Sequence, residues 1–170
     1  RITGNVRTKD KVIRRELKLS PGDPFSGEGI TRSFNNLRDL NYFDNVTIVP
    51  EQTGEPDKAD LVVDVKEREK TGLFVFGGGY SSVDNIVGFV SVEQTNFDIA
   101  NWPSLTGGGQ DLKLWLQMGS ETQGYNLSFT EPYFRDRPVW LGPDLFSSER
   151  DWDEYTVKKT RFDMRAGRRF

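Results

Sequence analysis

Apolar and polar residues follow two different periods along the chain, and the change falls near residue 70. Before it, Ile30, Phe34 and Leu37 recur at intervals of four and three residues, which places them on one face of a helix. After it the helical spacing disappears, and apolar and polar residues alternate in one short segment after another. The change of period predicts two domains, residues 1–70 and residues 71–170.

The first domain is predicted to be a compact α+β module with the element order β-α-α-β-β. RITGNV is a short strand candidate, and Thr8 can cap a helix through KDKVIRRELK that buries Val12 and Ile13. Ser26 can cap the second helix. NYFDNVTIV and ADLVVDVKERE then alternate as strands do. Two helices on one face of a small sheet enclose the core of such a module.

The second domain is predicted to consist of antiparallel transmembrane β-strands. The run DLKLWLQM, for example, puts Leu112, Leu114 and Leu116 on one face and Lys113 on the other. Segments of about ten alternating residues joined by turns are typical of an outer-membrane barrel, although a soluble β-sandwich alternates as well. The predicted strands cover residues 72–82, 86–96, 110–120, 123–131, 139–148 and 155–170.

Two observations favour the membrane interpretation. Residues 161–169 are too charged for a thin sheet backed by solvent, but they suit a wet barrel interior. Aromatic residues gather mostly at strand ends, where interfacial girdles lie; they are Trp102, Trp115, Tyr133, Phe134, Trp140, Trp152 and Tyr155. Because a membrane barrel needs at least about eight strands, the six predicted here are expected to form part of a larger one.

The composition excludes several functional classes. The formal net charge is −3, so no global basic field indicates a nucleic-acid partner. The chain has no cysteine and no histidine, which removes disulfides, thiolate zinc sites, a cysteine nucleophile and the usual base of a serine hydrolase. We therefore expect no enzyme, no catalytic or metal site and no cofactor. The carboxylate pairs Glu67/Glu69 and Asp151/Asp153 are expected to lie at a strand end and in a loop.

The stretch GLFVFGGGYSS raises the question of a phosphate-binding loop. It lacks the G-x-x-x-x-G-K-[ST] order, and no lysine follows to reach a phosphate. Its apolar and aromatic neighbours indicate a strand, which the three glycines weaken because each lacks a side chain to pack and costs backbone entropy. The second triplet, in LTGGGQD, is expected to mark a turn between strands.

Open strand edges are therefore the candidate sites, since an unpaired edge offers N–H and C=O groups to another chain. The α+β module is expected to expose the edge formed by Asn45, Val46, Thr47, Ile48 and Val49. The first barrel strand has to pair with the last strand of a closed barrel, and glycines there loosen the pairing; its residues are Gly72, Leu73, Phe74, Val75, Phe76, Gly77, Gly78, Gly79, Tyr80, Ser81 and Ser82.

These segments together resemble a known family. GNVRTKDKVIRREL, NNLRDLNYFDNVTI and ADLVVDVKERE resemble a POTRA domain. KTGLFVFGGGYSSVDNIVGFVSVEQTNF is similar to the junction and first barrel hairpin of the BamA family of outer-membrane protein assembly factors. LSFTEPYFRDRP is similar to the strand of that family that ends in Glu-Pro-Tyr/Trp-Phe. The family's Val-Arg-Gly-Phe loop motif is absent, and we expect it beyond Phe170.

The resemblance implies a periplasmic POTRA domain followed by the start of a 16-stranded barrel in the outer membrane. It implies an insertase that folds unfolded outer-membrane protein clients into the membrane lipid by pairing them at a lateral seam, where the first and last strands meet. It also implies docking of accessory lipoproteins, for which Arg14, Arg15 and Glu16 are candidates. The alternatives are a two-partner secretion transporter, an autotransporter assembly factor, or a soluble periplasmic peptide-binding module.

Overall fold

The computed structural model describes residues 1–54, 58–82, 85–152 and 154–168. The chain divides into two compact units, one formed by Arg1–Thr71 with Asp98–Gly109 and the other by Gly72–Phe97 with Gln110–Phe170. The chain first passes from one unit to the other between Thr71 and Gly72, next to the predicted boundary at residue 70. Residues 98–109 differ from the prediction, because they pack with the first unit although strands of the second flank them.

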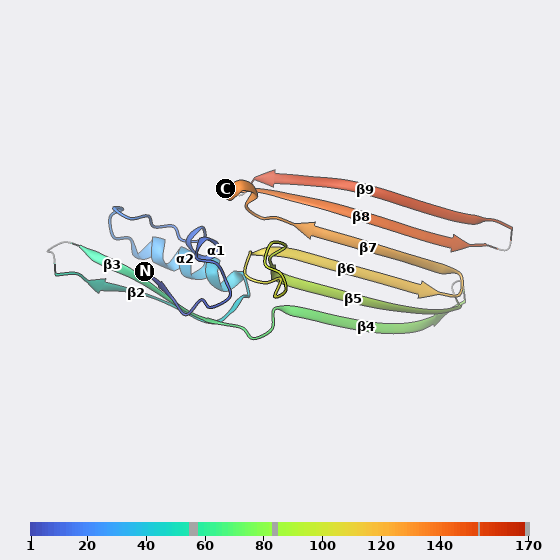
Figure 1. The fold of residues 1–170 in the computed structure, drawn as a ribbon, viewed down its shortest axis with the longest axis horizontal. Helices are drawn as coiled ribbons and strands as arrows, with labels where there is room; N and C mark the ends of the chain where they lie inside the picture. Colours follow the sequence, from blue (N-terminus) through green and yellow to red (C-terminus); the bar gives the residue numbers. More distant parts are fainter. Residues whose placement is uncertain (55–57, 83–84, 153, 169–170) are drawn as a thin grey trace. The chain divides into compact units, whose positions relative to one another are not determined.

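The first unit is an α+β domain built on a three-stranded sheet (Figure 1). Its elements are β1 (Ile2–Thr3), α1 (Asp10–Arg14), α2 (Gly27–Asp39), β2 (Phe43–Gln52) and β3 (Ala59–Glu67). β3 lies in the middle of the sheet, parallel to β1 and antiparallel to β2. The predicted β-α-α-β-β order is confirmed.

The helix starts differ from each other in how they are capped. Ser26 caps α2 as predicted, because its hydroxyl accepts a hydrogen bond from the N–H of Gly29 at 3.1 Å. The prediction that Thr8 caps α1 is wrong. Lys9 holds the cap position without a side-chain bond, and the N–H of Thr8 donates to Glu67 Oε1 at 2.6 Å. Thr8 is thus tied to the end of β3 instead.

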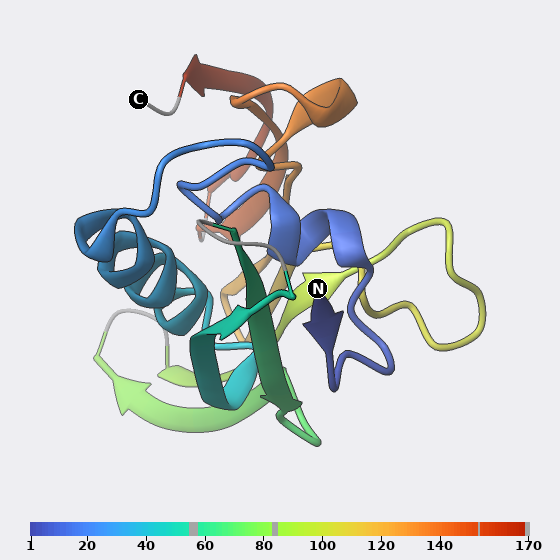
Figure 2. The same ribbon diagram turned by 90° about the vertical axis from the view of Figure 1, so that its left-hand side faces the viewer.

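The core of this domain lies between the helices and one face of the sheet (Figure 2). Val46 and Ile48 pair in register with Val65 and Val63, so all four side chains share that face. The buried core residues from the helices and strands are Val12, Ile13, Leu37, Tyr42, Phe43, Val46, Val63 and Val65. Burying each such aliphatic side chain contributes about 1.5–3 kcal/mol, which makes this cluster the main source of the domain's stability.

The second unit is a six-stranded antiparallel sheet in which each strand pairs with its neighbours in sequence. Its strands are β4 (Gly72–Ser81), β5 (Asn85–Phe97), β6 (Gln110–Gly119), β7 (Thr122–Thr130), β8 (Val139–Asp151) and β9 (Thr156–Arg168), with a 3-10 turn η1 (Phe134–Asp136) before β8. All six predicted strands are present. β8 runs three residues beyond its predicted end, and the predicted end of the last strand at Phe170 lies outside the described residues.

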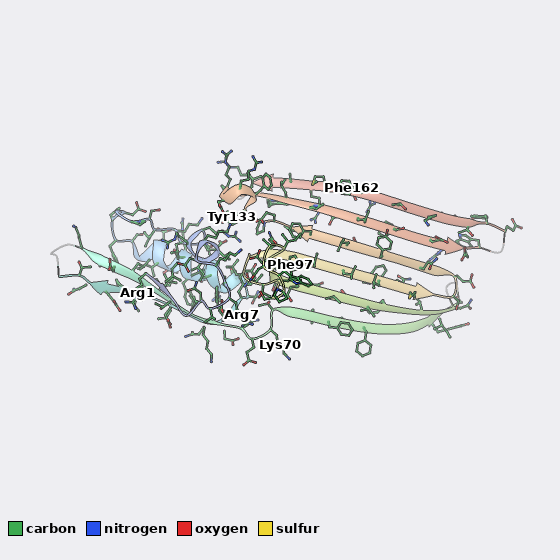
Figure 3. The ribbon with its side chains drawn as sticks, viewed as in Figure 1. Arg1, Arg7, Lys70, Phe97, Tyr133 and Phe162 are labelled. Carbon is green, nitrogen blue, oxygen red and sulfur yellow. The ribbon has the colours of Figure 1, made fainter. Side chains whose placement is uncertain are left out.

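The two faces of this sheet differ in chemistry, as the alternation predicted. One register row crosses all six strands and contains only apolar residues: Phe74, Val92, Leu114, Leu127, Leu145 and Phe162. The next row, on the opposite face, runs through Leu73, Glu93, Lys113, Ser128, Asp144 and Asp163. Phe74 is 62% exposed and Phe162, labelled in Figure 3, is 63% exposed. An apolar face of this extent is far larger than soluble monomers leave uncovered.

The residues assigned to an aromatic girdle do not share one environment: Trp140, at the start of β8, lies on the polar face beside the Arg165 guanidinium, and Trp102 belongs to the first unit. Tyr133 and Phe134 lie at the turn before β8, and Trp152 and Tyr155 stack at 6.3 Å beside the β8–β9 hairpin. Trp115 instead lies in the middle of β6, on the polar face, in register with Ser91 and Asn126. A mid-strand position on that face is not a membrane interface, so its assignment to the girdle is wrong.

Candidate functional site

Strand β4 lies at one edge of the six-stranded sheet and pairs only with β5 among the described residues. In an antiparallel strand, alternate residues direct both their N–H and C=O groups to the same side. A strand of 10 residues therefore offers a row of hydrogen-bonding groups along its open edge. Chemically, this edge can accept another strand.

The three glycines of β4 have different surroundings. A Cβ on Gly77 would lie 2.8 Å from the ring of Phe89, its register partner, and a Cβ on Gly78 would lie 3.2 Å from the carbonyl of Val87. A Cβ on Gly79 would meet nothing within 4 Å. Neither space nor a left-handed φ therefore requires glycine at position 79. The glycine at position 79 weakens the strand at the edge of the sheet.

The second predicted edge, residues 45–49, belongs to β2 at the edge of the three-stranded sheet. Val46 is buried in the core, whereas Asn45, Thr47 and Val49 alternate with the inward positions. The register of β2 against β3 shifts between Phe43 and Asn45, so a bulge lies directly before this segment. The open side of β2 is thus available for strand addition from residue 45 onward.

The predicted docking residues do not lie together on the surface. Arg14 is exposed and lies 4.0 Å from the carboxylate of Asp10. Arg15 is largely buried, and its Nη2 donates to the carbonyl oxygen of Gly109 at 3.2 Å. Glu16 is only 3% exposed. Because Arg15 and Glu16 are enclosed within the domain, only Arg14 is left as an accessible docking candidate.

Glu67 has a structural role that the sequence did not reveal. Its carboxylate accepts the backbone N–H groups of Val6, Arg7 and Thr8 at 3.2, 2.9 and 2.6 Å. Burial acts to raise the pKa of Glu67, but hydrogen bonds from the side chain and N–H of Thr8 and the N–H groups of Arg7 and Val6 outweigh it, so the pKa lies below its usual range. This carboxylate holds the chain before α1 against the end of β3.

The polar face of the six-stranded sheet carries ion pairs between neighbouring strands. Lys113 on β6 lies 3.2 Å from Glu93 on β5. Arg165 on β9 binds both carboxylate oxygens of Asp144 on β8 and donates to the hydroxyl of Ser128 on β7 at 3.1 Å. Such bidentate pairing fixes the register of three strands. The predicted charged interior face is therefore organised as cross-strand pairs.

The described part of the chain holds no cluster of metal-ligand side chains. No group of three or more candidate ligands gathers there in a geometry that could hold a metal ion. Among the same residues, no helix is both long and apolar enough to cross a membrane. Glu69 offers only its carbonyl oxygen to Arg7 Nη1 at 2.8 Å, and Asp153 of the second carboxylate pair lies outside the described residues.

Comparison with known families matches both units. Residues 1–68 match the POTRA model, described as a surface antigen variable number repeat, and residues 104–170 match the Omp85 superfamily domain. BamA from Neisseria meningitidis serogroup B is 36% identical over 152 residues, which cover 88% of this chain and 18% of that protein. The chain belongs to the BamA family. A putative outer membrane protein assembly factor from Treponema pallidum is 32% identical, over 85% of this chain and 17% of its own length.

Solved structures agree with membership of the BamA family. BamA from Haemophilus ducreyi, lacking POTRA domains 1–3, superposes with a TM-score of 0.76 at 26% identity, over 95% of this chain and 30% of that one. CdiB from Acinetobacter baumannii shares the fold with a TM-score of 0.58 at 12% identity, over 98% of this chain and 33% of that one. The chain spans less than a fifth of the length of the relatives from Neisseria meningitidis and Treponema pallidum.

BamA-family membership also gives the location of the two units. The POTRA domain is periplasmic, and the six-stranded sheet lies in the outer membrane. The apolar face described above, with the exposed Phe74 and Phe162, is the kind of surface that transmembrane β-strands present. The soluble-module alternative leaves that face without a cover.

Proposed function

We propose that the full-length protein folds and inserts β-barrel proteins into the outer membrane, with β4 as the strand that pairs with the client. The observation that carries the proposal is an open β4 edge that is weakened by glycine and borders a continuous apolar face. The relatives named as outer membrane protein assembly factors support it.

Pairing at β4 gives a client strand both its hydrogen bonds and its orientation. Residues that are register partners point to the same face of a sheet. A client strand in register with Phe74 and Phe76 therefore has to place its own apolar residues on the lipid side. The client gains backbone hydrogen bonds that lipid cannot supply, where each unsatisfied group costs several kcal/mol. The reaction breaks no covalent bond, so it needs no catalytic residue, nucleotide or cofactor.

The seam has to open for a client to enter, and the glycines of β4 lower the cost of opening. In the closed barrel, β4 pairs with the last barrel strand. Glycine within a strand weakens pairing by about 0.5–1 kcal/mol per residue relative to alanine. Gly79, where a side chain would meet no steric obstacle, is the residue at which this weakness has no packing reason.

The POTRA domain supplies a second, periplasmic contact in this proposal. The edge of β2 from Asn45 to Val49 receives a client segment by strand addition, and Arg14 is a docking position for an accessory lipoprotein. These two roles rest on the open edge and on exposure. They are separate from the role of β4.

Cysteine crosslinking in the full-length protein, reconstituted in liposomes, tests the seam. A cysteine pair can be introduced to join β4 to the last barrel strand. Residues 1–170 contain no cysteine, so no native thiol in this part of the protein competes with the introduced pair. The crosslink is expected to stop client insertion, and reduction is expected to restore it. Val75→Cys with Ser91→Cys is the matched control, because these register partners already lie on paired strands. Insertion that continues undiminished across a crosslinked seam contradicts the proposal.

A further inference from the structure

The connection between β5 and β6 is an ordered loop that folds with the POTRA domain (Figure 2). Within Asp98–Gly109, the N–H of Asp98 donates to the carbonyl of Leu105 at 2.9 Å, and the N–H of Leu105 donates to Asn101 at 2.6 Å. The side chain of Asn101 also donates to the carbonyl of Thr106 at 2.9 Å. These bonds close the loop on itself, so it keeps a shape that can be recognised by a partner surface.

Lys9, at the start of α1, binds this loop twice. Its Nζ lies 2.5 Å from Asp98 Oδ2, and its backbone N–H donates to the carbonyl of Gly107 at 3.0 Å. The Asp98 side chain is 4% exposed, and its other oxygen accepts the N–H of Ala100 at 3.2 Å. Separating Lys9 from Asp98 leaves a buried carboxylate without its counter-ion, which is strongly unfavourable.

Two glycines allow the loop backbone to approach the domain closely. Gly107 has φ +101, and a Cβ there would lie 2.0 Å from the carbonyl oxygen of Arg7. Gly109 has φ +70, and a Cβ there would lie 2.4 Å from Arg15 Nη2 and 2.9 Å from Val12. Gly107 and Gly109 in LTGGGQD are therefore required for docking, not only for a turn.

We propose that Lys9, Asp98 and Gly107 form a latch, through which the POTRA domain holds the end of the β5–β6 hairpin. Asp98 directly follows Phe97, the last residue of β5 (labelled in Figure 3). β5 is the strand that pairs along the whole of β4. A force on the POTRA domain therefore acts on the strand that supports the seam strand, and not only through the covalent link at residue 71. The consequence for insertion rests on the proposed function above.

Hydrogen exchange in the full-length protein in detergent micelles tests the latch without any client. The variants are Lys9→Met, Asp98→Asn, the double variant and Gly107→Ala. Each single variant is expected to speed exchange of the Lys9 amide about tenfold, and to speed exchange of the β5 amides near Phe97 and of their partners at the start of β4. The double variant is expected to speed exchange less than Lys9→Met alone, because Lys9→Met leaves the buried Asp98 carboxylate without its counter-ion and the double variant removes that carboxylate.

Gly22→Ala is the matched control for Gly107→Ala. Gly22 has φ +93 but nothing within 4 Å of an added Cβ, so its variant carries the same kind of backbone strain without blocking a contact. It is expected to leave the Lys9 amide unchanged. Unchanged exchange at Lys9 in all latch variants overturns the latch. Faster exchange at Lys9 with no change in β4 and β5 overturns its hold on the hairpin.

Client insertion is measured separately in liposomes. Latch variants are expected to insert clients several-fold more slowly than the unmodified protein. If the unmodified protein inserts no client, the proposed function fails while the exchange data still decide the latch. If latch variants lose the exchange protection but insert clients at the unmodified rate, the latch is not part of insertion and the coupling is refuted.

Discussion

Replacing Gly79 by valine isolates the effect of strand strength at the seam. A Cβ added there meets nothing within 4 Å, and the backbone has no left-handed φ, so the position has room for the start of a side chain without backbone strain. Removing a glycine from a strand gains about 0.5–1 kcal/mol, and the preference of valine for strands adds a similar amount within a scale of about 1 kcal/mol. A total of about 1–2 kcal/mol favours the paired seam by a factor of roughly five to thirty.

Client insertion by the full-length protein in liposomes is the assay, with the rate of seam crosslinking as an independent measure of the paired state. Gly79→Val is expected to slow insertion by roughly five- to thirtyfold but not to slow seam crosslinking, because the crosslink forms while β4 is paired with the last barrel strand. Gly88→Val is the matched control, because it adds the same side chain to β5, an interior strand, where the nearest atoms lie at ordinary distances of 3.7 and 3.9 Å. It is expected to leave the seam unaffected.

Two outcomes separate the explanations. If Gly79→Val speeds insertion, weakness at the edge is not what the glycine provides, and the reasoning is refuted. If Gly88→Val slows insertion equally, the cause is general stiffening of the sheet. Gly77→Val is less informative, since its side chain has to displace the Phe89 ring that lies 2.8 Å away, and the two effects oppose each other.

Three further predictions concern the stability of the two units, measured on the full-length protein. The lowered pKa of Glu67 means that its carboxylate stabilises the fold above the usual glutamate pKa of about 4.3, and that this contribution is lost as the pH falls through the folded value; the protection factor of the Val6 amide, which corrects for the intrinsic pH dependence of exchange, is expected to fall on acidification, and Glu67→Gln is expected to flatten that dependence. Leu37→Ala is expected to destabilise the POTRA domain by about 2–5 kcal/mol in denaturant unfolding, because its side chain is completely buried, whereas exposed Val6→Ala is expected to change it by less than about 0.5 kcal/mol. Arg165→Met is expected to cost at most about 1 kcal/mol in thermal unfolding in detergent, since the pair with Asp144 is partly exposed; a larger loss contradicts this estimate.

The strands of the sheet could be predicted because alternation records which face each residue occupies. Leu112, Leu114 and Leu116 alternate with polar residues, and the register puts them on the face that carries Phe74. The hairpin turns then fix the order of the strands. This information is local in sequence, so it survives without knowledge of any distant contact. It does not determine where a short strand ends, and β8 runs further than its pattern indicated.

The errors concern residues whose role depends on contacts distant in sequence. Arg15 and Glu16 have the charge of a surface pair, but the loop at Gly109 and the side chain of Asn36 enclose that part of the chain. Thr8 has the composition of a helix cap, yet Glu67 takes its N–H. In each case a partner from another part of the chain overrides the local preference, and a single sequence carries no signal for it.

The two glycine triplets look alike in sequence, but glycine is present in them for opposite physical reasons. In β4 the backbone is extended and Gly79 has open space, so a side chain is tolerated at that position and its absence weakens pairing. In the β5–β6 loop, Gly107 and Gly109 have positive φ and lie against backbone and side-chain atoms, so side chains are excluded and their absence permits tight docking. One triplet makes a contact easier to break, and the other makes a contact possible. If both inferences hold, glycine loosens the seam strand on its open side, while the loop next to its paired neighbour is held firmly by the POTRA domain.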